Sequence, residues 1–102
     1  MAVLNHREAP CRVWRNNVGM LRDSRGVPVR YGLGVGSPDL VGLVIGSGQF
    51  LAVEIKTPVG RLSDEQKAWL ATVQKMGGIA RVIRSVDQAV ELVDELRMPR
   101  AA

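Results

Sequence analysis

The chain has 102 residues, of which 46% are hydrophobic and 24% charged, and its formal net charge is +4 at pH 7. These values are typical of a folded domain and exclude a disordered chain, so we expect a single domain over residues 1–102. Charges or glycines interrupt every apolar stretch before the roughly 20 residues of a bilayer span, so we expect neither a membrane span nor a secretory signal.

The charge is uneven, because residues 1–85 hold 12 of the 14 Lys and Arg but only 6 of the 10 acids. A basic body is typical of a nucleic-acid binder, although basic charge without any partner is the simpler alternative. The single cysteine, Cys11, cannot form an internal disulfide, and with only one histidine a structural zinc site is not expected. This cysteine usage fits a reducing compartment, and we expect the protein in the cytoplasm.

The first part of the chain predicts a helix, a strand and a long loop. Residues 2–9 are compatible with a short helix that Pro10 ends, since the residue before a proline avoids the helical region. Residues 11–15 alternate in polarity, as a strand does. Residues 16–36 are rich in Gly, Asn, Arg and Asp and predict a loop with a short strand at residues 20–22.

The second part predicts a hairpin followed by helix, strand and helix. Residues 39–45 and 49–57 are rich in Val, Ile and Leu, with glycines between them. A helix is expected over residues 63–76, a strand over 79–83 and a last helix from Ser85 to before Pro99. This order predicts an α/β fold, a mixed sheet flanked by helices.

Apolar residues at helical spacing and caps support both helices. Gly77-Gly78 follows the first helix. The expected core positions are Trp69, Leu70, Val73 and Met76 in the first helix and Val86, Ala89, Val90, Val93 and Leu96 in the second.

The register of the hairpin decides whether its charged residues meet. If Gly46-Ser47 is a two-residue turn, Asp39 lies directly opposite Glu54, and Lys56 shares their face. A three-residue loop with a bulge would shift the pairing by one residue and separate the carboxylates.

Two carboxylates on apolar strands predict a divalent cation. They repel each other unless a cation lies between them, and Mg²⁺ prefers such oxygen ligands. We therefore expect Mg²⁺ or Mn²⁺ on Asp39, Glu54 and the backbone carbonyl of Ile55, with Lys56 beside an attacking water. The alternative is a structural ion pair between Glu54 and Lys56, with Asp39 capping a turn.

Gln66 allows two interpretations. Ser63 and Gln66 have the spacing of a capping box, which would satisfy backbone donors at the helix start. Alternatively, Gln66 projects from the helix N-terminus toward the metal-bound water or a phosphate.

The loop before Asp39 carries glycines and is bracketed by arginines. Gly32, Gly34 and Gly36 precede a strand and not a helix, so they are not a dinucleotide-binding loop. The basic residues predict either a solvated loop or a rim that contacts DNA phosphates. The expected DNA contacts are Arg15, Asn16, Asn17, Arg30, Ser37, Arg61 and Lys67. Trp14 is expected in the core, and a platform on which a base stacks is the alternative.

Three segments resemble the VRR-NUC family, a branch of the PD-(D/E)xK nucleases. They are residues 36–42 (GSPDLVG), residues 54–56 (EIK) and residues 63–67 (SDEQK), with further similarity at residues 15–19 and at Gly77-Gly78. The resemblance implies a restriction-endonuclease-like core and metal-dependent DNA cleavage. It carries the catalytic roles to Asp39, Glu54, Lys56 and Gln66.

The resemblance also implies a homodimer that acts on branched DNA, such as four-way junctions or flaps. Related nucleases often carry a metal-binding glutamate in the first helix, and Glu8 is the one residue here that could serve. A basic DNA-binding module without catalysis on the same fold is the alternative function, and a structural domain that is basic by accident is a third.

Overall fold

A computed structural model describes residues 1–98 as two helices and six strands. The elements in chain order are β1 (Cys11–Arg15), β2 (Gly19–Arg22), β3 (Pro28–Tyr31), β4 (Leu40–Val44), β5 (Phe50–Ile55), α1 (Asp64–Lys75), β6 (Ile79–Ile83) and α2 (Val86–Arg97). None of the helices in this part of the chain is long and apolar enough to cross a bilayer.

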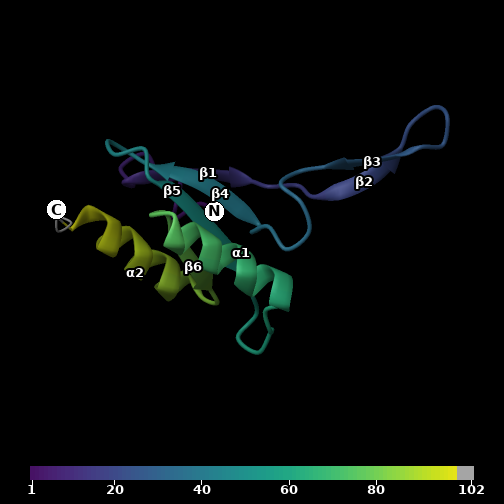
Figure 1. Cartoon of the computed structure of the whole chain (residues 1–102). Helices are drawn as coiled ribbons and strands as arrows, with labels where there is room; N and C mark the ends of the chain where they lie inside the picture. The colour runs from purple at the N-terminus through teal and green to yellow at the C-terminus, as the bar shows by residue number, and fades with distance from the viewer. Residues whose placement is uncertain (99–102) are drawn as a thin grey trace.

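Four strands form a mixed sheet in the order β1-β4-β5-β6 (Figure 1). The pairs β1/β4 and β4/β5 are antiparallel, whereas β5 and β6 are parallel. Parallel neighbours need a crossover connection, and α1 supplies it. The predicted α/β core with a mixed sheet is therefore confirmed.

The helices cover opposite faces of the sheet. On one face α2 packs on alternate strand residues such as Leu51 and Val53, together with Leu4 from the N-terminal turns. On the other face α1 places Leu70 and Val73 against Ala52 and Ala80. Because β5 is covered on both faces, its residues from Leu51 to Glu54 are all buried.

The ends of α1 follow the predicted caps. Ser63 accepts a hydrogen bond from the Gln66 backbone and Gln66 accepts one from Ser63, which is a complete capping box. After the last turn Gly77 adopts a φ of 95°, a conformation that side chains disfavour. Pro99, expected to end α2, lies outside the described residues.

The hairpin of β4 and β5 has the predicted register but a different turn. Leu40 pairs with Val53, so Asp39, one residue earlier, lies opposite Glu54. The turn is not the expected two-residue one, because the Gly48 N–H donates to Val44 O across a four-residue loop. The longer loop takes one residue from each strand, so the register is unchanged.

Some sequence-based expectations were wrong. Residues 2–9 form turns and not a helix, and residues 28–31 form strand β3 where we expected loop. Among the expected helix core positions, Met76, Val86 and Val90 are exposed, and Leu92 is buried instead.

The missed strand completes a hairpin with β2, which forms a separate two-stranded sheet. Figure 1 shows this hairpin extending away from the four-stranded sheet and both helices. At its turn, Asp23 Oδ1 accepts hydrogen bonds from the backbone N–H groups of Arg25 and Val27. An Asx turn of this kind is a sequence signal of a hairpin. We predicted a loop here because the segment around it is rich in Gly, Asn, Arg and Asp.

Candidate active site

The Asp39 carboxylate is fixed at the start of β4. Its Oδ2 accepts a hydrogen bond of 2.9 Å from the Ile55 N–H on the neighbouring strand. Its backbone carbonyl accepts another of 2.8 Å from Asn16 N, which continues the β1/β4 ladder. The side chain stays exposed, so a ligand can reach it from solvent.

Glu54 is the buried carboxyl group of the site. It lies on β5, on the α1 face, and only 1% of its surface is exposed. Its Oε1 accepts a hydrogen bond of 3.3 Å from Gln66 Nε2. Its Oε2 is buried and has no hydrogen-bond partner within residues 1–98. A buried carboxylate oxygen without a partner carries a large desolvation cost.

The surroundings of Glu54 disfavour its ionised form in the metal-free protein. The pKa of Glu54 is raised to about 7, mainly by burial and then by the Asp39 carboxyl, which accepts a hydrogen bond from protonated Glu54 and repels its ionised form. The Lys56 ammonium lowers the pKa of Glu54, in opposition to these effects. The two acids and the lysine therefore act on one another electrostatically, as their shared face requires.

Lys56 lies just beyond the end of β5 and is half-buried. Its backbone N–H donates to Ile83 O at 3.0 Å, which extends the β5/β6 pairing by one residue and fixes the start of the side chain. Side chains alternate along an extended chain, so Lys56 and Glu54 emerge on the same side.

Gln66 makes the predicted capping contact and also contacts the buried Glu54, whereas its approach to a metal-bound water or a phosphate stays a prediction. Its Oε1 accepts from the Ser63 N–H at 2.9 Å, as a capping box requires. Its Nε2 donates to Glu54, so the same side chain connects the start of α1 to the buried carboxylate. The two roles use different atoms of one amide group and do not compete.

The glycine loop before Asp39 packs against the start of α1. Gly36 has a φ of 81°, and a Cβ at this position would lie 2.5 Å from Glu65 Cβ. Only glycine fits so close to the helix in this conformation. The loop and the helix N-terminus therefore border the site together.

Two predicted DNA contacts are engaged inside the protein. Asn16 Nδ2 donates to Ser37 Oγ at 2.7 Å and to Pro38 O at 2.9 Å, and Asn16 Oδ1 accepts from Leu33 N. The Ser37 hydroxyl in turn donates to Gly34 O. We therefore interpret Asn16 and Ser37 as positioning residues that fix the loop next to Asp39.

The other predicted DNA contacts are exposed. Arg15 and Asn17 line a cavity of about 410 Å³ together with Asp39 and Ile55. Arg61 precedes α1 and Lys67 lies in its first turns, while Arg30 lies on β3. The lining residues missed by the sequence analysis, Met1 and Leu40, are apolar and carried no chemical signal.

Glu8 lies at the opposite end of the sheet from the other acids. Pro10 O accepts from Ile45 N just past the end of β4, whereas Asp39 precedes its start. Five strand residues separate these ends by roughly 17 Å. The Glu8 carbonyl is also bonded to Arg97 at the end of α2. The predicted metal role of Glu8 is therefore not supported.

The donor set for a cation is consequently small. No group of three or more His, Cys, Asp and Glu side chains in residues 1–98 could hold a metal ion. The available donors are the carboxylates of Asp39 and Glu54 and backbone oxygens near Ile55. These donors fit a cation that retains several waters. Among them, the buried Glu54 Oε2 is the oxygen that lacks a hydrogen-bond partner, so a bound cation would satisfy it.

Trp14 is not in the core. It is 50% exposed on β1, opposite Val41, on the face that carries Asp39. The prediction was wrong because α1 contacts β5 and β6 and leaves this face of β1 uncovered. Trp69 packs beside α1's buried residues, as expected.

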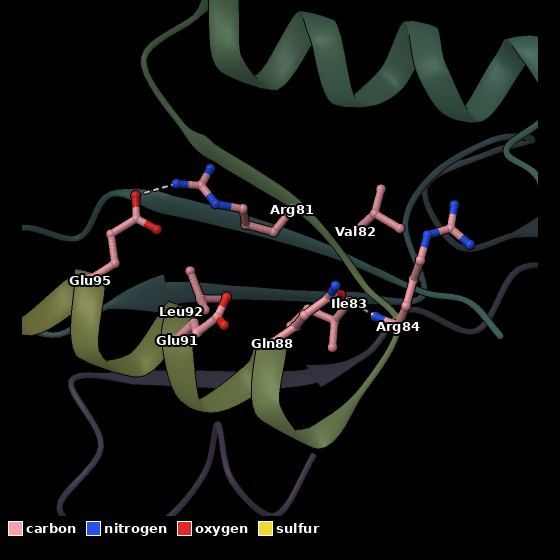
Figure 2. Close-up of a pocket in the computed structure, with 8 residues that line it drawn as sticks. All are labelled: Arg81, Val82, Ile83, Arg84, Gln88, Glu91, Leu92 and Glu95. Atoms are coloured by element: carbon pink, nitrogen blue, oxygen red, sulfur yellow. Dashed lines mark hydrogen bonds and ion pairs between the residues drawn. The ribbon is translucent and has the colours of Figure 1, made fainter. Parts of the chain in front are cut away.

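A separate cavity of about 210 Å³ lies between β6 and α2 (Figure 2). Two pairs of its polar groups interact: Arg81 pairs with Glu95, and Gln88 Oε1 accepts from the Arg84 N–H. None of the predicted site residues lines it. We therefore place the candidate site at Asp39 and Glu54 and not here.

Comparison with known families agrees with this arrangement. The family model of the VRR-NUC domain matches residues 8–87, a range that includes Asp39, Glu54, Lys56 and Gln66. The chain belongs to the VRR-NUC family. Its function is accordingly of the nuclease type, with DNA as the substrate, on the expected restriction-endonuclease-like fold. No curated protein matches the chain.

Proposed function

We propose that this VRR-NUC domain is a metal-dependent endonuclease that hydrolyses DNA phosphodiester bonds. The observation that carries the proposal is the buried Glu54 carboxyl, with one unpartnered oxygen, beside the Asp39 carboxylate. Two neighbouring carboxylates do not stabilise a fold, because they repel each other when no cation lies between them. A site that binds a cation and a phosphate needs them.

Asp39 and Glu54 would hold the cation, Mg²⁺ or Mn²⁺, and the Ile55 carbonyl is the third protein donor that we propose. When bound, such a cation polarises a phosphoryl oxygen and lowers the pKa of a coordinated water. Hydrogen bonds from Ile55 N and Gln66 Nε2 orient the two carboxylates. Glu54, whose ionised form is disfavoured by its surroundings, would be held ionised by a bound cation.

Lys56 places a positive charge at the same face, where it offsets charge that develops on the attacked phosphate and orients the water. Gln66 acts as a positioning residue for Glu54. The N-terminus of α1 contributes its dipole near the substrate anion. Arg15, Asn17, Arg30, Arg61 and Lys67 are the side chains that we propose to contact the DNA backbone, since all are exposed.

We further propose that the domain acts as a homodimer on branched DNA, such as four-way junctions or flaps. One chain offers a single pair of acids, whereas cutting both strands of a junction needs two sites. The support for this part is the family resemblance together with the small size of the chain.

A cleavage assay tests the proposal. Labelled linear, flapped and four-way DNA is incubated with wild type, Asp39→Asn, Lys56→Ala and Lys75→Ala, each with Mg²⁺, Mn²⁺ or chelator. We expect metal-dependent cleavage by wild type, a loss of roughly 100-fold or more in Asp39→Asn and Lys56→Ala, and no change in Lys75→Ala. Lys75 is the charge-loss control because it is exposed at the far end of α1.

Cleavage that persists in chelator, or that is equal in wild type and Asp39→Asn, would refute the assignment. DNA binding without cleavage under any metal would instead support the non-catalytic DNA-binding module.

A further inference from the structure

The net charge of the protein resides in one segment. Residues 12–38 contain five arginines and one aspartate, a net charge of +4, which equals the net charge of the whole chain. The remaining residues carry equal numbers of basic and acidic side chains. Any attraction of the protein for a polyanion is therefore strongest along this segment, which contains β2 and β3.

The β2–β3 hairpin has two chemically different faces. Met20 pairs with Arg30 and Arg22 with Pro28, so these side chains share one face and make it basic. Leu21 pairs with Val29, and with Tyr31 they make the other face apolar. All three are exposed, Leu21 at 66%. The hairpin is thus an amphipathic ribbon with both faces open to solvent.

The ribbon has little support from the rest of the protein. It forms its own two-stranded sheet and extends beyond the body (Figure 1). An isolated two-stranded hairpin is marginally stable in water, and exposed apolar patches usually mark binding surfaces. These features point to a partner outside the chain.

The ribbon starts at the candidate active site. Asn16 and Asn17, just before β2, line the cavity that contains Asp39. After β3 the chain returns to Asp39 through the loop that Asn16 holds by its bonds to Ser37, Pro38 and Leu33. A duplex that passes the site would therefore also pass the ribbon.

We propose that the β2–β3 ribbon is an arm that binds the DNA duplex flanking the cleavage site, with Arg22 and Arg30 facing phosphates. DNA is favoured over a second copy of the chain as the partner. Two ribbons packed together would repel each other through their arginines, whereas DNA phosphates neutralise this positive charge. Proteins that grip DNA grooves combine arginines with apolar side chains, which accounts for both faces of the ribbon. The inference rests on the proposed function for the nature of the substrate.

The length of the arm sets its reach. The ribbon runs from Gly19 through β2 to the turn at Arg25, roughly 20 Å at the rise of an extended chain. At 3.4 Å per base pair this corresponds to about 6 base pairs of flanking duplex. The contribution of the arm to affinity is therefore expected to disappear when the flanking duplex is shorter than this.

The test compares the double variant Arg22→Ala/Arg30→Ala with Arg7→Ala/Lys75→Ala, which removes two exposed charges away from the site. DNA affinity is measured in chelator against salt, with flanking duplexes of 4 or 16 base pairs. We expect the ribbon variant to bind the long duplex roughly tenfold more weakly, with a log–log salt slope lower by about 2. We expect no loss on the short duplex, and no change in the control on either.

Arg22 Nη1 also donates to Gly26 O in the turn, so a second variant separates charge from folding. Arg22→Lys/Arg30→Lys keeps both charges and should retain most of the salt slope. Melting curves of all variants report the fold of the body.

The ribbon inference fails if Arg22→Ala/Arg30→Ala keeps the wild-type slope and length dependence, or if wild type binds no DNA. It also fails if Leu21→Ser/Val29→Ser halves the solution mass while the arginine variant binds normally, because the partner is then a second copy. If the arginine variant loses affinity as expected but wild type cuts no DNA, the ribbon inference holds and the nuclease proposal falls.

Discussion

Glu54 is the residue where stability and the proposed chemistry conflict most clearly. It is a carboxyl group in the covered centre of a sheet, with one oxygen bonded to Gln66 and the other without a partner. The sequence identified this residue because a charged group on an apolar strand is costly. Which of its oxygens lacks a partner followed only from the packing of α1.

The raised pKa of Glu54 predicts a pH dependence of stability in the metal-free protein. Its ordinary value is 4.5 and the folded value is about 7, so the folded state keeps a proton that the unfolded state releases. Between these two pH values unfolding releases a proton, and the free energy of unfolding falls as pH rises. We expect melting temperatures in chelator to decrease by several degrees from pH 5 to pH 8.

Two variants test whether Glu54 causes this pH dependence of the melting temperature. Glu54→Gln should flatten the pH profile, because the titrating group is gone. Asp39→Asn should reduce the decrease and melt slightly higher than wild type at pH 8, since it relieves repulsion while its amide oxygen can still accept from Ile55 N. A marked destabilisation of Asp39→Asn would favour the structural ion pair instead. An unchanged profile in Glu54→Gln would contradict the assignment to this group.

At the scale of elements, α1 both covers the sheet and supplies the site. Its capping box was predicted from Ser63 and Gln66, and its end from Gly77. Helix ends are local, since they depend on side chains within one turn, and the sequence predicts them well. Residues 2–9 do not form a helix, and they are held by tertiary contacts instead: Leu4 lies in the core, and the Asn5 side chain bonds to the Val13 backbone on β1.

The shared role of Gln66 predicts that capping and chemistry can be separated. Ser63→Ala removes only the cap and should cost about 1 kcal/mol of stability, a melting decrease of about 4–8 °C, with the cleavage rate of the folded protein unchanged. Gln66→Ala should show the same loss of stability and also a reduced cleavage rate. Thermal melts and single-turnover cleavage measure both. Equal cleavage by Gln66→Ala and Ser63→Ala would mean that Gln66 is a cap alone.

At the scale of the whole molecule, a basic ribbon is attached at the site: residues 19–31 hold three arginines and one aspartate, a net charge of +2, which is half the net charge of the chain. Both the exposed ribbon and the uncovered face around Trp14 are surfaces that one chain leaves open. The dimer that we propose for cutting two strands would need a surface beyond the site itself.

Solution mass checks the dimer. We expect light scattering to give twice the 11.1 kDa mass of the chain at micromolar concentration. We expect Trp14→Ser to leave the sheet intact, because the Trp14 side chain is half exposed and its one neighbour across the strand pair is Val41 on β4. A mass of one chain at all concentrations would contradict the dimer, without bearing on the acids at the site.

The sequence alone determined the order of the core elements and the caps of α1, and it favoured the hairpin register that sets Asp39 opposite Glu54. All of these depend on periodicity and short-range contacts, which are written in consecutive residues. The tertiary structure alone decided that Glu8 lies far from the site, that Asn16 and Ser37 are engaged within the loop, and that residues 28–31 form a ribbon. Those outcomes depend on which segments that are distant in the sequence pack together, and a pattern of neighbouring residues contains no information about such contacts.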